Sequence, residues 1–440
     1  MKKLNRREFV QTGSGTALVA SVAPAALGAA PPAVSGKHGS KKFKIAIIGV
    51  GSRGTLFLKA SLDRFNVDVP ALCDFREEAA QRGVEMVREK LGYEPDTYTD
   101  GPNDYRRLLE RDDVDAVFIT TPTWWHGPMA IDSLRAHKHV FSEVPACNTI
   151  QEGWDLVRAA QETDAKYFMA ENLCFTRSNM MILNAVEKGV FGTLTFAECG
   201  YIHEARNLQF DEDGSLNWRG SLNSRTDLIA NTYPTHALGP TSMWFGIPRG
   251  DQLRQCVSMM TPAYSFREYA IRRFGPDSPG ATATWNGDNT VSLIRTESGA
   301  VIFLRFDICS PRPHHIDYYT LQGTKASYDD EAGMFVDGKS KDWDPVPDYY
   351  ERYDHPFWTR HGEAALRTGH GGGDYFVVEH FYKCLTEDRT PGIDVYDAVT
   401  WSSLIPLSAK SVRENGATQE VPDYTEGQWK NRRRYDWSNG

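Results

Sequence analysis

The feature that most constrains the fold is a glycine-rich turn that joins a short apolar run to a helical segment. The run covers residues 43–48, and the turn after it carries three glycines at G-x-G-x-x-G spacing, Gly49, Gly51 and Gly54. The first glycine allows a tight turn, the second lets the backbone approach a pyrophosphate, and the third lets helix pack closely on strand. Free N–H groups at the start of the helix then face the phosphates. This order predicts a dinucleotide-binding βαβ unit.

A second apolar run, and the acid at its end, indicate which dinucleotide the turn binds. Residues 67–73 form the run, and Asp74 follows it directly. A carboxylate at this point accepts hydrogen bonds from the adenosine ribose hydroxyls and repels a 2′-phosphate. The pattern therefore favours NAD over NADP as the cofactor. The alternative is a glycine turn in another kind of α/β protein.

The residues before this unit have the features of an export signal. Arg6 and Arg7 form a twin-arginine pair, and residues 12–29 are a weakly apolar stretch too short and too mild to anchor stably in a bilayer. Residues 28–30 offer a cleavage region, and we expect residues 1–40 to be a signal and linker outside the fold. The protein would then be exported by the twin-arginine route and be periplasmic or secreted. The alternative is a disordered basic amino terminus.

Export by this route constrains how the cofactor is used. Twin-arginine export moves folded proteins, often with a cofactor already seated, into a space that has no known NAD supply. We therefore expect NAD to be tightly bound and recycled. Such retention suits a catalyst that regenerates its cofactor internally, and it is awkward for a dehydrogenase that exchanges NAD for NADH at each turnover.

Composition narrows the remaining classes of protein. Hydrophobic residues make up 40% and charged residues 24%, as in soluble globular proteins. The chain after the signal exceeds one ordinary core, so we expect two domains. The net charge of −9 argues against a nucleic-acid partner. The seven cysteines are widely spaced without a C-x-x-C pair, so the sequence indicates neither a metal site nor a disulfide framework.

Alternating strand and helix patterns predict an NAD-binding Rossmann-type α/β domain over residues 41–172. Nearly continuous apolar runs predict buried parallel strands, and the helical segments between them imply right-handed crossovers. The predicted strands are residues 43–48, 67–73, 114–120, 139–142 and 166–170, and the predicted helices are residues 77–90, 104–110, 127–137 and 150–163.

The pattern changes in residues 173–440, for which we predict an α+β substrate domain with a mainly antiparallel open sheet. Its predicted strands are residues 193–201, 253–260, 290–296, 301–308 and 318–322, and its predicted helices are residues 179–188, 374–384 and 394–409. The carboxyl-terminal helices could pack back on the first domain. The open sheet could pair with that of a second copy, which would give a homo-oligomer.

Three segments follow strands of the parallel sheet at the edge where ligands of such sheets bind. They are residues 121–126, 143–145 and 171–172. We expect all three to face the nicotinamide half of the cofactor. For Trp124 and Trp125, in the first segment, ordinary core packing is the alternative.

The layout resembles the Gfo/Idh/MocA oxidoreductase family. Most members have Glu-Lys-Pro at the second of these segments, with the lysine at the substrate, whereas this chain has Glu143-Val144-Pro145, which argues against an ordinary sugar dehydrogenase. The chain is more similar to glycoside hydrolase family 109, the NAD-dependent N-acetylgalactosaminidases, over essentially the whole length after the signal. The stretches that carry this resemblance are residues 171–174 (ENLC), 182–192 (ILNAVEKGVFG), 233–236 (YPTH), 353–356 (YDHP), 369–372 (GHGG) and 394–397 (DVYD) with Trp401.

The resemblance implies a set of site residues by position. In addition to Gly49, Gly51 and Gly54, it implies NAD contacts from Ser52, Arg53, Asp74, Thr123, Trp124, Trp125, His126, Glu143, Val144, Asn172 and Tyr233. It implies substrate contacts from Tyr201, Arg219, Tyr233, Pro234, Thr235 and His236. Two positions depart from the family. Phe175 replaces a tyrosine that has been assigned a role in the chemistry, and His314 and His315 stand where the family has a substrate-binding tyrosine.

The chemistry that the resemblance implies is a redox-assisted elimination without net oxidation. NAD takes a hydride from C3 of the sugar, a base removes the acidified C2 proton, the glycosidic oxygen leaves from C1, water adds, and the hydride returns. We expect His236 to be a base at C3 or C2, Tyr233 a proton donor or relay, and Glu143 a group that orients His236 or a sugar hydroxyl. The alternatives are a buried structural role for His236 and a ribose contact without chemistry for Glu143.

The expected function is therefore hydrolysis of glycosides, with N-acetylgalactosaminides as the expected substrates. Two other functions stay open. One is an NAD-dependent sugar dehydrogenase. The other is a non-catalytic sugar-binding protein that retains NAD structurally, which Phe175 gives some support. The sequence leaves the anomer, the exact acid–base assignment and the oligomeric state open.

Overall fold

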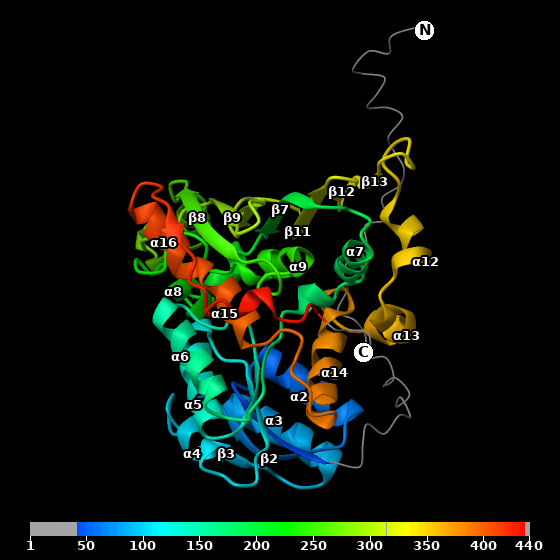
Figure 1. Ribbon diagram of the computed structural model, residues 1–440. Helices are drawn as coiled ribbons and strands as arrows, with labels where there is room; N and C mark the ends of the chain where they lie inside the picture. Colours follow the sequence, from blue (N-terminus) through cyan, green and yellow to red (C-terminus); the bar gives the residue numbers. More distant parts are fainter. Residues whose placement is uncertain (1–41, 314, 436–440) are drawn as a thin grey trace. The chain divides into compact units, whose positions relative to one another are not determined.

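The computed structural model describes residues 42–313 and 315–435 (Figure 1). The predicted twin-arginine signal and linker, residues 1–40, lie outside the described residues, and so does His314. Two sheets organise the described chain, one of 6 strands and one of 8.

The first sheet is parallel throughout and has the order β3-β2-β1-β4-β5-β6. This is the strand order of the doubly wound dinucleotide-binding fold, so the predicted Rossmann-type sheet is confirmed. The edge strand β3 was not predicted, because it has three residues, two of them exposed, which is too few to show a period. The strands are β1 (Phe43–Ile48), β2 (Val67–Cys73), β3 (Asp96–Tyr98), β4 (Ala116–Ile119), β5 (His139–Ser142) and β6 (Tyr167–Met169).

The helices between these strands begin and end close to their predicted positions. They are α2 (Ser52–Arg64), α3 (Glu77–Leu91), α4 (Tyr105–Leu109), α5 (His126–Arg135) and α6 (Ile150–Gln161). α3 ends where Gly92 adopts a left-handed conformation with φ of 79°, which glycine reaches without steric cost. α6 begins after Thr149, whose side chain accepts a hydrogen bond from the N–H of Glu152.

The second sheet has the order β13-β12-β11-β7-β10-β9-β8-β14, and of its pairs only β7 and β10 run parallel. The predicted, mainly antiparallel sheet is therefore confirmed. Along β9, buried and exposed residues alternate through all 7 positions, which leaves one face of the sheet open. The strands are β7 (Leu194–Ile202), β8 (Leu253–Met260), β9 (Thr290–Thr296), β10 (Val301–Asp307), β11 (Ile316–Gly323), β12 (Ala326–Asp329), β13 (Gly333–Val336) and β14 (Gln419–Glu420).

The helices of the second part depart from the sequence-based expectation in two ways. Six of them, α8 to α13, were not predicted, among them α9, which starts inside the YPTH motif, and residues 394–409 belong to two helices rather than one. Pro406 explains the break, since proline lacks the N–H that a continuing helix needs and fits the first turn of a new one. The helices are α7 (Arg177–Glu187), α8 (Trp218–Asn223), α9 (Thr235–Phe245), α10 (Ser265–Phe274), α11 (Pro279–Thr282), α12 (Tyr350–Tyr353), α13 (Pro356–Ala365), α14 (Gly373–Thr386), α15 (Val395–Ser402) and α16 (Leu404–Arg413).

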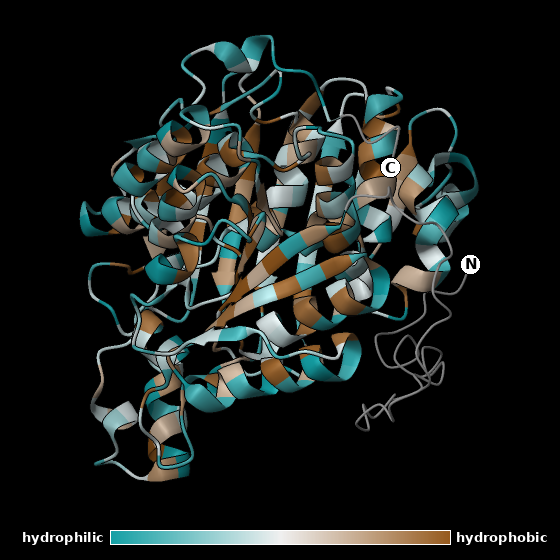
Figure 2. Ribbon diagram, turned by 90° about the horizontal axis from the view of Figure 1, so that it is seen from below, coloured by the Kyte–Doolittle hydropathy of each residue, from teal (hydrophilic) through white to brown (hydrophobic). Residues whose placement is uncertain are grey.

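Carboxyl-terminal helices pack back on the parallel sheet. Phe381 of α14 meets Phe118 of β4 edge-to-face, with ring centroids 5.5 Å apart, and Tyr382 lies 6.2 Å from Phe43 of β1. α14 also contacts α2, and α15 contacts α6 and β6 (Figure 1). Apolar residues gather on the strands and on the helix faces turned toward them (Figure 2). Within residues 42–313 and 315–435, no helix has both the length and the apolar character required to span a bilayer. The boundary at residues 172–173 stays a prediction.

Candidate active site

The glycine turn between β1 and α2 has the geometry that its three glycines require. Gly49 has φ of +92°, and a Cβ there would lie 2.8 Å from the backbone of Thr120. A Cβ on Gly54 would lie 2.0 Å from the carbonyl oxygen of Gly49, so helix and strand touch at backbone distance. A Cβ on Gly51 would meet only the tip of Arg76, at 3.5 Å. The Gly51 backbone is therefore open to a ligand, as dinucleotide binding needs.

The donors and the acid around this turn also fit a dinucleotide. Gly51, the residue before α2, makes no side-chain cap, so the first N–H groups of the helix, from Ser52 onward, are directed at an incoming anion. Asp74 is buried at the end of β2, where its carboxylate accepts hydrogen bonds from the N–H of Val50 at 2.9 Å and of Arg76 at 2.9 Å. The carboxylate is thereby fixed beside the glycine turn, where the adenosine ribose of an NAD molecule would bind.

Residues 121–126, which follow β4, include both core residues and residues near the site. Trp125 packs partly buried on the main core, edge-to-face with Tyr105 at 6.5 Å, which matches the core alternative for this residue. Trp124 meets Trp218 of α8 edge-to-face at 6.3 Å. Thr123 is buried, and its carbonyl oxygen accepts a hydrogen bond from Asn148.

His126 joins two strand ends instead of presenting its ring to a ligand. Its Nδ1 and Nε2 lie 2.8 Å from the carbonyl oxygens of Pro145 and Thr121, and the residue is 1% exposed. Burial lowers the pKa of His126, against the opposing effect of these carbonyls. The imidazole therefore holds the β4 and β5 ends together.

An ion-pair network lies at the edge of the parallel sheet and is centred on Arg53. The Arg53 Nε donates to Glu143 at 2.6 Å, and its two terminal nitrogens donate to Asp374 at 3.2 and 3.0 Å. Asp374 also accepts from Asn172 Nδ2 at 2.9 Å and is bonded to His370 Nδ1 at 2.8 Å. Arg53 thus separates two carboxylates that would otherwise repel each other.

The pKa values of this network follow from its charges. Burial lowers the pKa of Arg53, but the charges of Glu143 and Asp374 outweigh burial and raise it. Burial raises the pKa of Asp374, but its bonds to His370 and Arg53 hold it far below its usual value. Arg53 and Asp374 are therefore both charged near neutrality.

Asp374 and His370 were not among the predicted site residues, although the GHGG stretch was noted. His370 lies in a short 3₁₀ turn (His370–Gly372) and has φ of +52°, which is uncommon for a residue other than glycine. Its side chain is 45% exposed, whereas that of Asp374 is 2% exposed. The GHGG stretch therefore places a solvent-facing histidine, fixed by a buried carboxylate, beside Arg53.

His236 forms the second histidine–carboxylate pair of the site. It is the second residue of α9, after Thr235, and its Nδ1 lies 2.7 Å from Oε1 of Glu171. The hydroxyl of Tyr319 donates to its carbonyl oxygen at 2.6 Å. Burial lowers the pKa of His236, but the charge and the hydrogen bond of Glu171 outweigh burial and raise it above 6.5.

This pair corrects the expected partner of His236. We expected Glu143 to orient either His236 or a sugar hydroxyl. In the structure Glu171 holds His236, whereas the two oxygens of Glu143 accept from Arg53 and, at 3.1 Å, from the N–H of Val144. The distance along the chain between residues 171 and 236 hid this pair, which only the fold brings together.

Aromatic rings surround the exposed side of His236. The rings of Tyr233 and Tyr201 lie 4.9 and 5.4 Å from its imidazole. Tyr201 stacks on His203 at 3.7 Å, and His203 stacks on His315 at 4.3 Å and contacts Asp317 at 3.1 Å. His315, one of the departures from the family pattern, therefore belongs to a ring stack that ends at the predicted substrate residue Tyr201.

The remaining predicted residues lie around these groups. Arg219 is the second residue of α8, and its guanidinium lies 4.3 Å from the ring of Trp218, which in turn contacts Trp124. Pro234 and Thr235 are buried, and the hydroxyl of Thr235 has no hydrogen-bond partner among the described residues. Val144 is 2% exposed. In the described part of the chain, no three His, Cys, Asp or Glu side chains are grouped so as to hold a metal ion.

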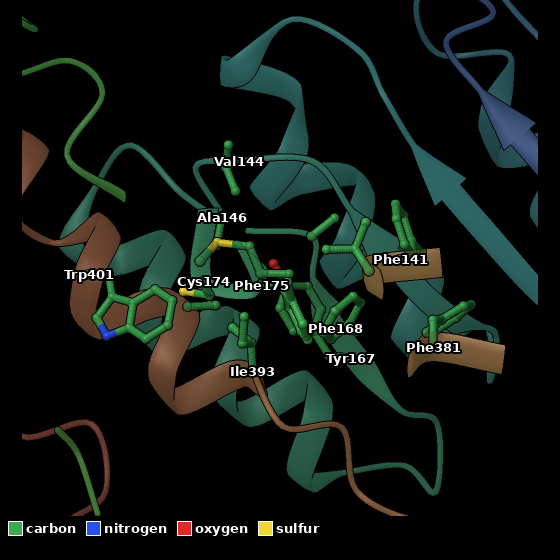
Figure 3. Packing of buried hydrophobic residues seen from close by; sticks show 14 of the residues in the cluster. Phe141, Val144, Ala146, Tyr167, Phe168, Cys174, Phe175, Phe381, Ile393 and Trp401 are labelled. Carbon is green, nitrogen blue, oxygen red and sulfur yellow. The ribbon is translucent and has the colours of Figure 1, made fainter. Parts of the chain in front are cut away.

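Phe175, the other departure, is a core residue. Its ring is 0% exposed, stacks on Phe357 at 6.3 Å, and meets Phe168 edge-to-face at 6.5 Å. Figure 3 shows Phe175 inside the packed cluster with Phe168 and Cys174. Phe175 therefore stabilises the segment that carries Glu171 and Asn172, and its ring carries no proton to transfer.

The Arg53 network and the group formed by Glu171, His236 and Tyr233 interact electrostatically. Burial raises the pKa of Tyr233 first, and the charge of Glu143 raises it further while Arg53 lowers it. The charge of Glu143 also raises the pKa of His236. Side chains from the parallel sheet, from α9 and from α14 therefore act on one site, next to the glycine turn that fits NAD.

Comparison with known proteins agrees with this geometry. Residues 43–171 match the family described as "Oxidoreductase family, NAD-binding Rossmann fold", and residues 175–431 match "Glycosyl hydrolase 109, C-terminal domain". Among solved structures, "Levoglucosan dehydrogenase, complex with NADH" aligns with a TM-score of 0.67 at 16% identity, over 87% of this chain and 100% of that one. An "inositol dehydrogenase homolog complexed with NAD+" from Azotobacter vinelandii aligns with a TM-score of 0.64 at 17% identity, over 87% and 98%. These likenesses establish the fold.

Curated relatives are more similar in sequence. The "Glycosyl hydrolase family 109 protein 2" of Shewanella sp. (strain MR-4) is 35% identical over 98% of both chains. The "Alpha-N-acetylgalactosaminidase" of Shewanella oneidensis is 34% identical over 98% of both chains. The chain therefore belongs to glycosyl hydrolase family 109, and it is a glycoside hydrolase whose amino-terminal part has the NAD-binding Rossmann fold.

Proposed function

We propose that the protein hydrolyses N-acetylgalactosaminides, or closely related glycosides, by transient oxidation of the sugar at C3, elimination and water addition. The observation that carries this proposal is the Glu171–His236 pair, which stands at the ligand-binding edge of an NAD-type parallel sheet. A histidine held by a carboxylate is suited to removing a proton near neutrality. The name of the Shewanella oneidensis relative supports the sugar class.

The chain's own residues would divide the proton transfers between them. When bound, the nicotinamide would supply a hydride acceptor for C3 and, later in the turnover, a hydride donor. His236 would remove the proton of the 3-hydroxyl. Tyr233, whose ring is 4.9 Å away, would relay the C2 proton to solvent during the elimination and a solvent proton back to C2 when water adds. Tyr201 and Arg219 bind hydroxyl or acetamido groups.

The network around Arg53 would hold the other side of the site. Glu143 and Asp374 fix Arg53 at the start of α2, where its charge assists binding of the pyrophosphate. His370 is the more exposed histidine, and Asp374 fixes its Nδ1, so it can exchange a proton with solvent and with a leaving oxygen. His236 thus acts at C3, the sugar carbon that is oxidised, and His370 acts at the glycosidic bond that is broken.

We also propose tight NAD retention, export and self-association. Retention is supported by the internal recycling of the hydride, and export by Arg6 and Arg7. A second copy on the open face of the second sheet is supported by Met259, Val291 and Leu293, which are 63%, 36% and 52% exposed.

One experiment separates the proposed function from its alternatives. Purified protein is incubated in D₂O, without added NAD, with aryl N-acetylgalactosaminides and related glycosides of both anomers. We expect many aglycones per protein and deuterium at C2 of the sugar. NADH accumulating in proportion to product would instead identify a dehydrogenase, and no turnover across the panel would favour a binding protein.

A pair of histidine variants locates the chemistry. We expect His236→Ala to lose turnover while NAD stays bound, because the residue contacts neither the glycine turn nor Asp74. His361→Ala, on α13 and against Tyr375, is the matched control, since His361 is outside the Glu171–His236 pair. A wild-type rate in His236→Ala would remove that residue from the mechanism.

A further inference from the structure

Glu171 is a buried carboxylate with unusually few partners. It is 0% exposed, its Oε1 lies 2.7 Å from His236 Nδ1 and 3.2 Å from the N–H of Leu173, and no described residue bonds its Oε2. Its ion pairs among the described residues comprise His236 alone. By contrast, Glu143 and Asp374 both contact Arg53.

Because its ion-pair partner is a histidine and not an arginine or lysine, the charge next to Glu171 can change. A buried carboxylate is costly unless a partner stabilises its charge, and a permanently charged partner does so in every state. The partner of Glu171 is an imidazole, whose charge changes when it takes up a proton. The pair therefore gains its full ion-pair attraction only after His236 is protonated.

We propose that Glu171 is a positioning residue that makes His236 a reversible store for the proton of the sugar's 3-hydroxyl during each turnover. This inference rests on the proposed function. The transient oxidation removes a hydride and a proton from the same carbinol group, and both must return to regenerate the alcohol. A bound nicotinamide would accept the hydride, and the Glu171–His236 pair would hold the proton until both return.

The proton balance of the step is simple. Because the Nδ1–H of His236 donates to Glu171, Nε2 carries the lone pair that faces the sugar. As the C3–H bond breaks and its electron pair leaves with the hydride, the O3–H proton moves to Nε2 and a C=O bond forms. The pair becomes imidazolium and carboxylate. The reverse transfer returns the proton to O3 when the hydride returns to C3.

The surroundings of His236 favour keeping the transferred proton on its imidazole over releasing it to solvent. Tyr233 and Tyr201 cover its ring, the hydroxyl of Tyr319 bonds its carbonyl oxygen, and the residue is 8% exposed. The other charges that act on it, Asp317 and Glu143, are also negative and favour the protonated form. No described arginine or lysine forms an ion pair with Glu171 or a hydrogen bond with His236 that would compete for this role.

The test compares Glu171→Gln with wild type and with the matched control Glu379→Gln, whose carboxylate pairs with Arg64 at the end of α2 and with no residue of the Glu171–His236 pair. The primary readout is the titration of His236 in the purified, dinucleotide-containing protein, followed by NMR of ¹³C-labelled histidine and assigned with His236→Gln. We expect the midpoint to move to lower pH in Glu171→Gln and to stay unchanged in Glu379→Gln. An unchanged midpoint in folded Glu171→Gln would overturn the proposal.

Kinetics provide the second readout. We expect kcat of Glu171→Gln to fall about 10²-fold, the lower end of what a positioned acid or base contributes, with KM and NAD content retained. The acid limb of its pH–rate profile should move to lower pH along with the His236 midpoint. A wild-type kcat and pH profile would overturn the role of Glu171 even if the protein proves to be a glycosidase.

Glu171→Asp covers the case in which the neutral variant does not fold. It keeps the charge but shortens its reach, so we expect the His236 midpoint to move in the same direction by less and part of kcat to remain. Equal midpoints in Glu171→Asp and wild type would overturn the proposal. The NMR titration needs no turnover, so a failure of the proposed function and a failure of this inference give different results.

Discussion

Two single-methyl changes in the glycine turn should separate folding from cofactor binding. In Gly54→Ala the new Cβ would lie 2.0 Å from the carbonyl oxygen of Gly49, about 1.4 Å inside ordinary contact at 3.4 Å. The obstacle is backbone, which cannot rotate away as a side chain can. In Gly51→Ala the nearest atom would be the flexible tip of Arg76 at 3.5 Å, and Gly51 has φ of −75°, which alanine adopts freely.

The magnitudes follow from these contacts. Overpacking costs about 1–3 kcal/mol, and the upper end applies to a clash with backbone. Alanine recovers about 1 kcal/mol over glycine inside a helix, so we expect Gly54→Ala to lower the free energy of unfolding by about 2 kcal/mol. For Gly51→Ala, the lower entropy of the unfolded chain offsets a weaker helix cap, and the net change should stay within about 0.5 kcal/mol.

The assay combines urea unfolding of the cofactor-free protein with NAD titration. Gly51→Ala should unfold like wild type and bind NAD at least about tenfold more weakly, because the methyl keeps the pyrophosphate from the backbone. Gly54→Ala should show the stability loss without added NAD. The reasoning is refuted if Gly54→Ala is as stable as wild type, or if Gly51→Ala binds NAD normally.

Three further outcomes follow from the site and the open sheet. Asp374→Asn should lower the free energy of unfolding by about 2 kcal/mol at neutral pH, less than a fully buried pair because Arg53 keeps Glu143 and is 26% exposed. Because the pKa of Asp374 is lowered by folding, this difference should persist above the ordinary value of 3.8 and vanish as pH falls through the folded value, which urea titrations at several pH values measure. The raised pKa of His236 should place the acid limb of kcat/KM above pH 6.5, since the base form is needed, and a limb at lower pH would argue against His236 as the base. If the open face pairs with a second copy, Leu293→Lys should convert an oligomer into a monomer in light scattering at unchanged circular dichroism, and an unchanged mass would exclude that face.

The sequence predicted the elements that have a clear period or a continuous apolar run. β1, β2, β8 and β9 were predicted at their observed bounds. β1 and β2 are mostly buried apolar runs, and β9 alternates strictly between buried and exposed residues. α9 was missed, since a helix buried in every residue, with Pro240 inside it, shows no amphipathic pattern. Short strands such as β13 have too few residues to show one.

The site was predictable only in part, for a related reason. Chain position can place Glu143 and Glu171 at the ends of neighbouring strands, but it cannot say which of them reaches His236. Asp374 meets Asn172 across 202 positions of chain, and no local pattern encodes that contact. Motifs therefore identified the cofactor turn and the histidine, while the pairing of charges required the fold.

The central claim is that bond cleavage depends on a bound dinucleotide that is not consumed. The most direct test removes the dinucleotide from the protein under mild denaturation, refolds it, and titrates NAD back while aglycone release is measured. We predict no activity without NAD, full activity at one NAD per chain, and many aglycones per NAD with no net NADH. Full activity of protein proven free of dinucleotide, or one NADH formed for each aglycone released, would contradict this claim.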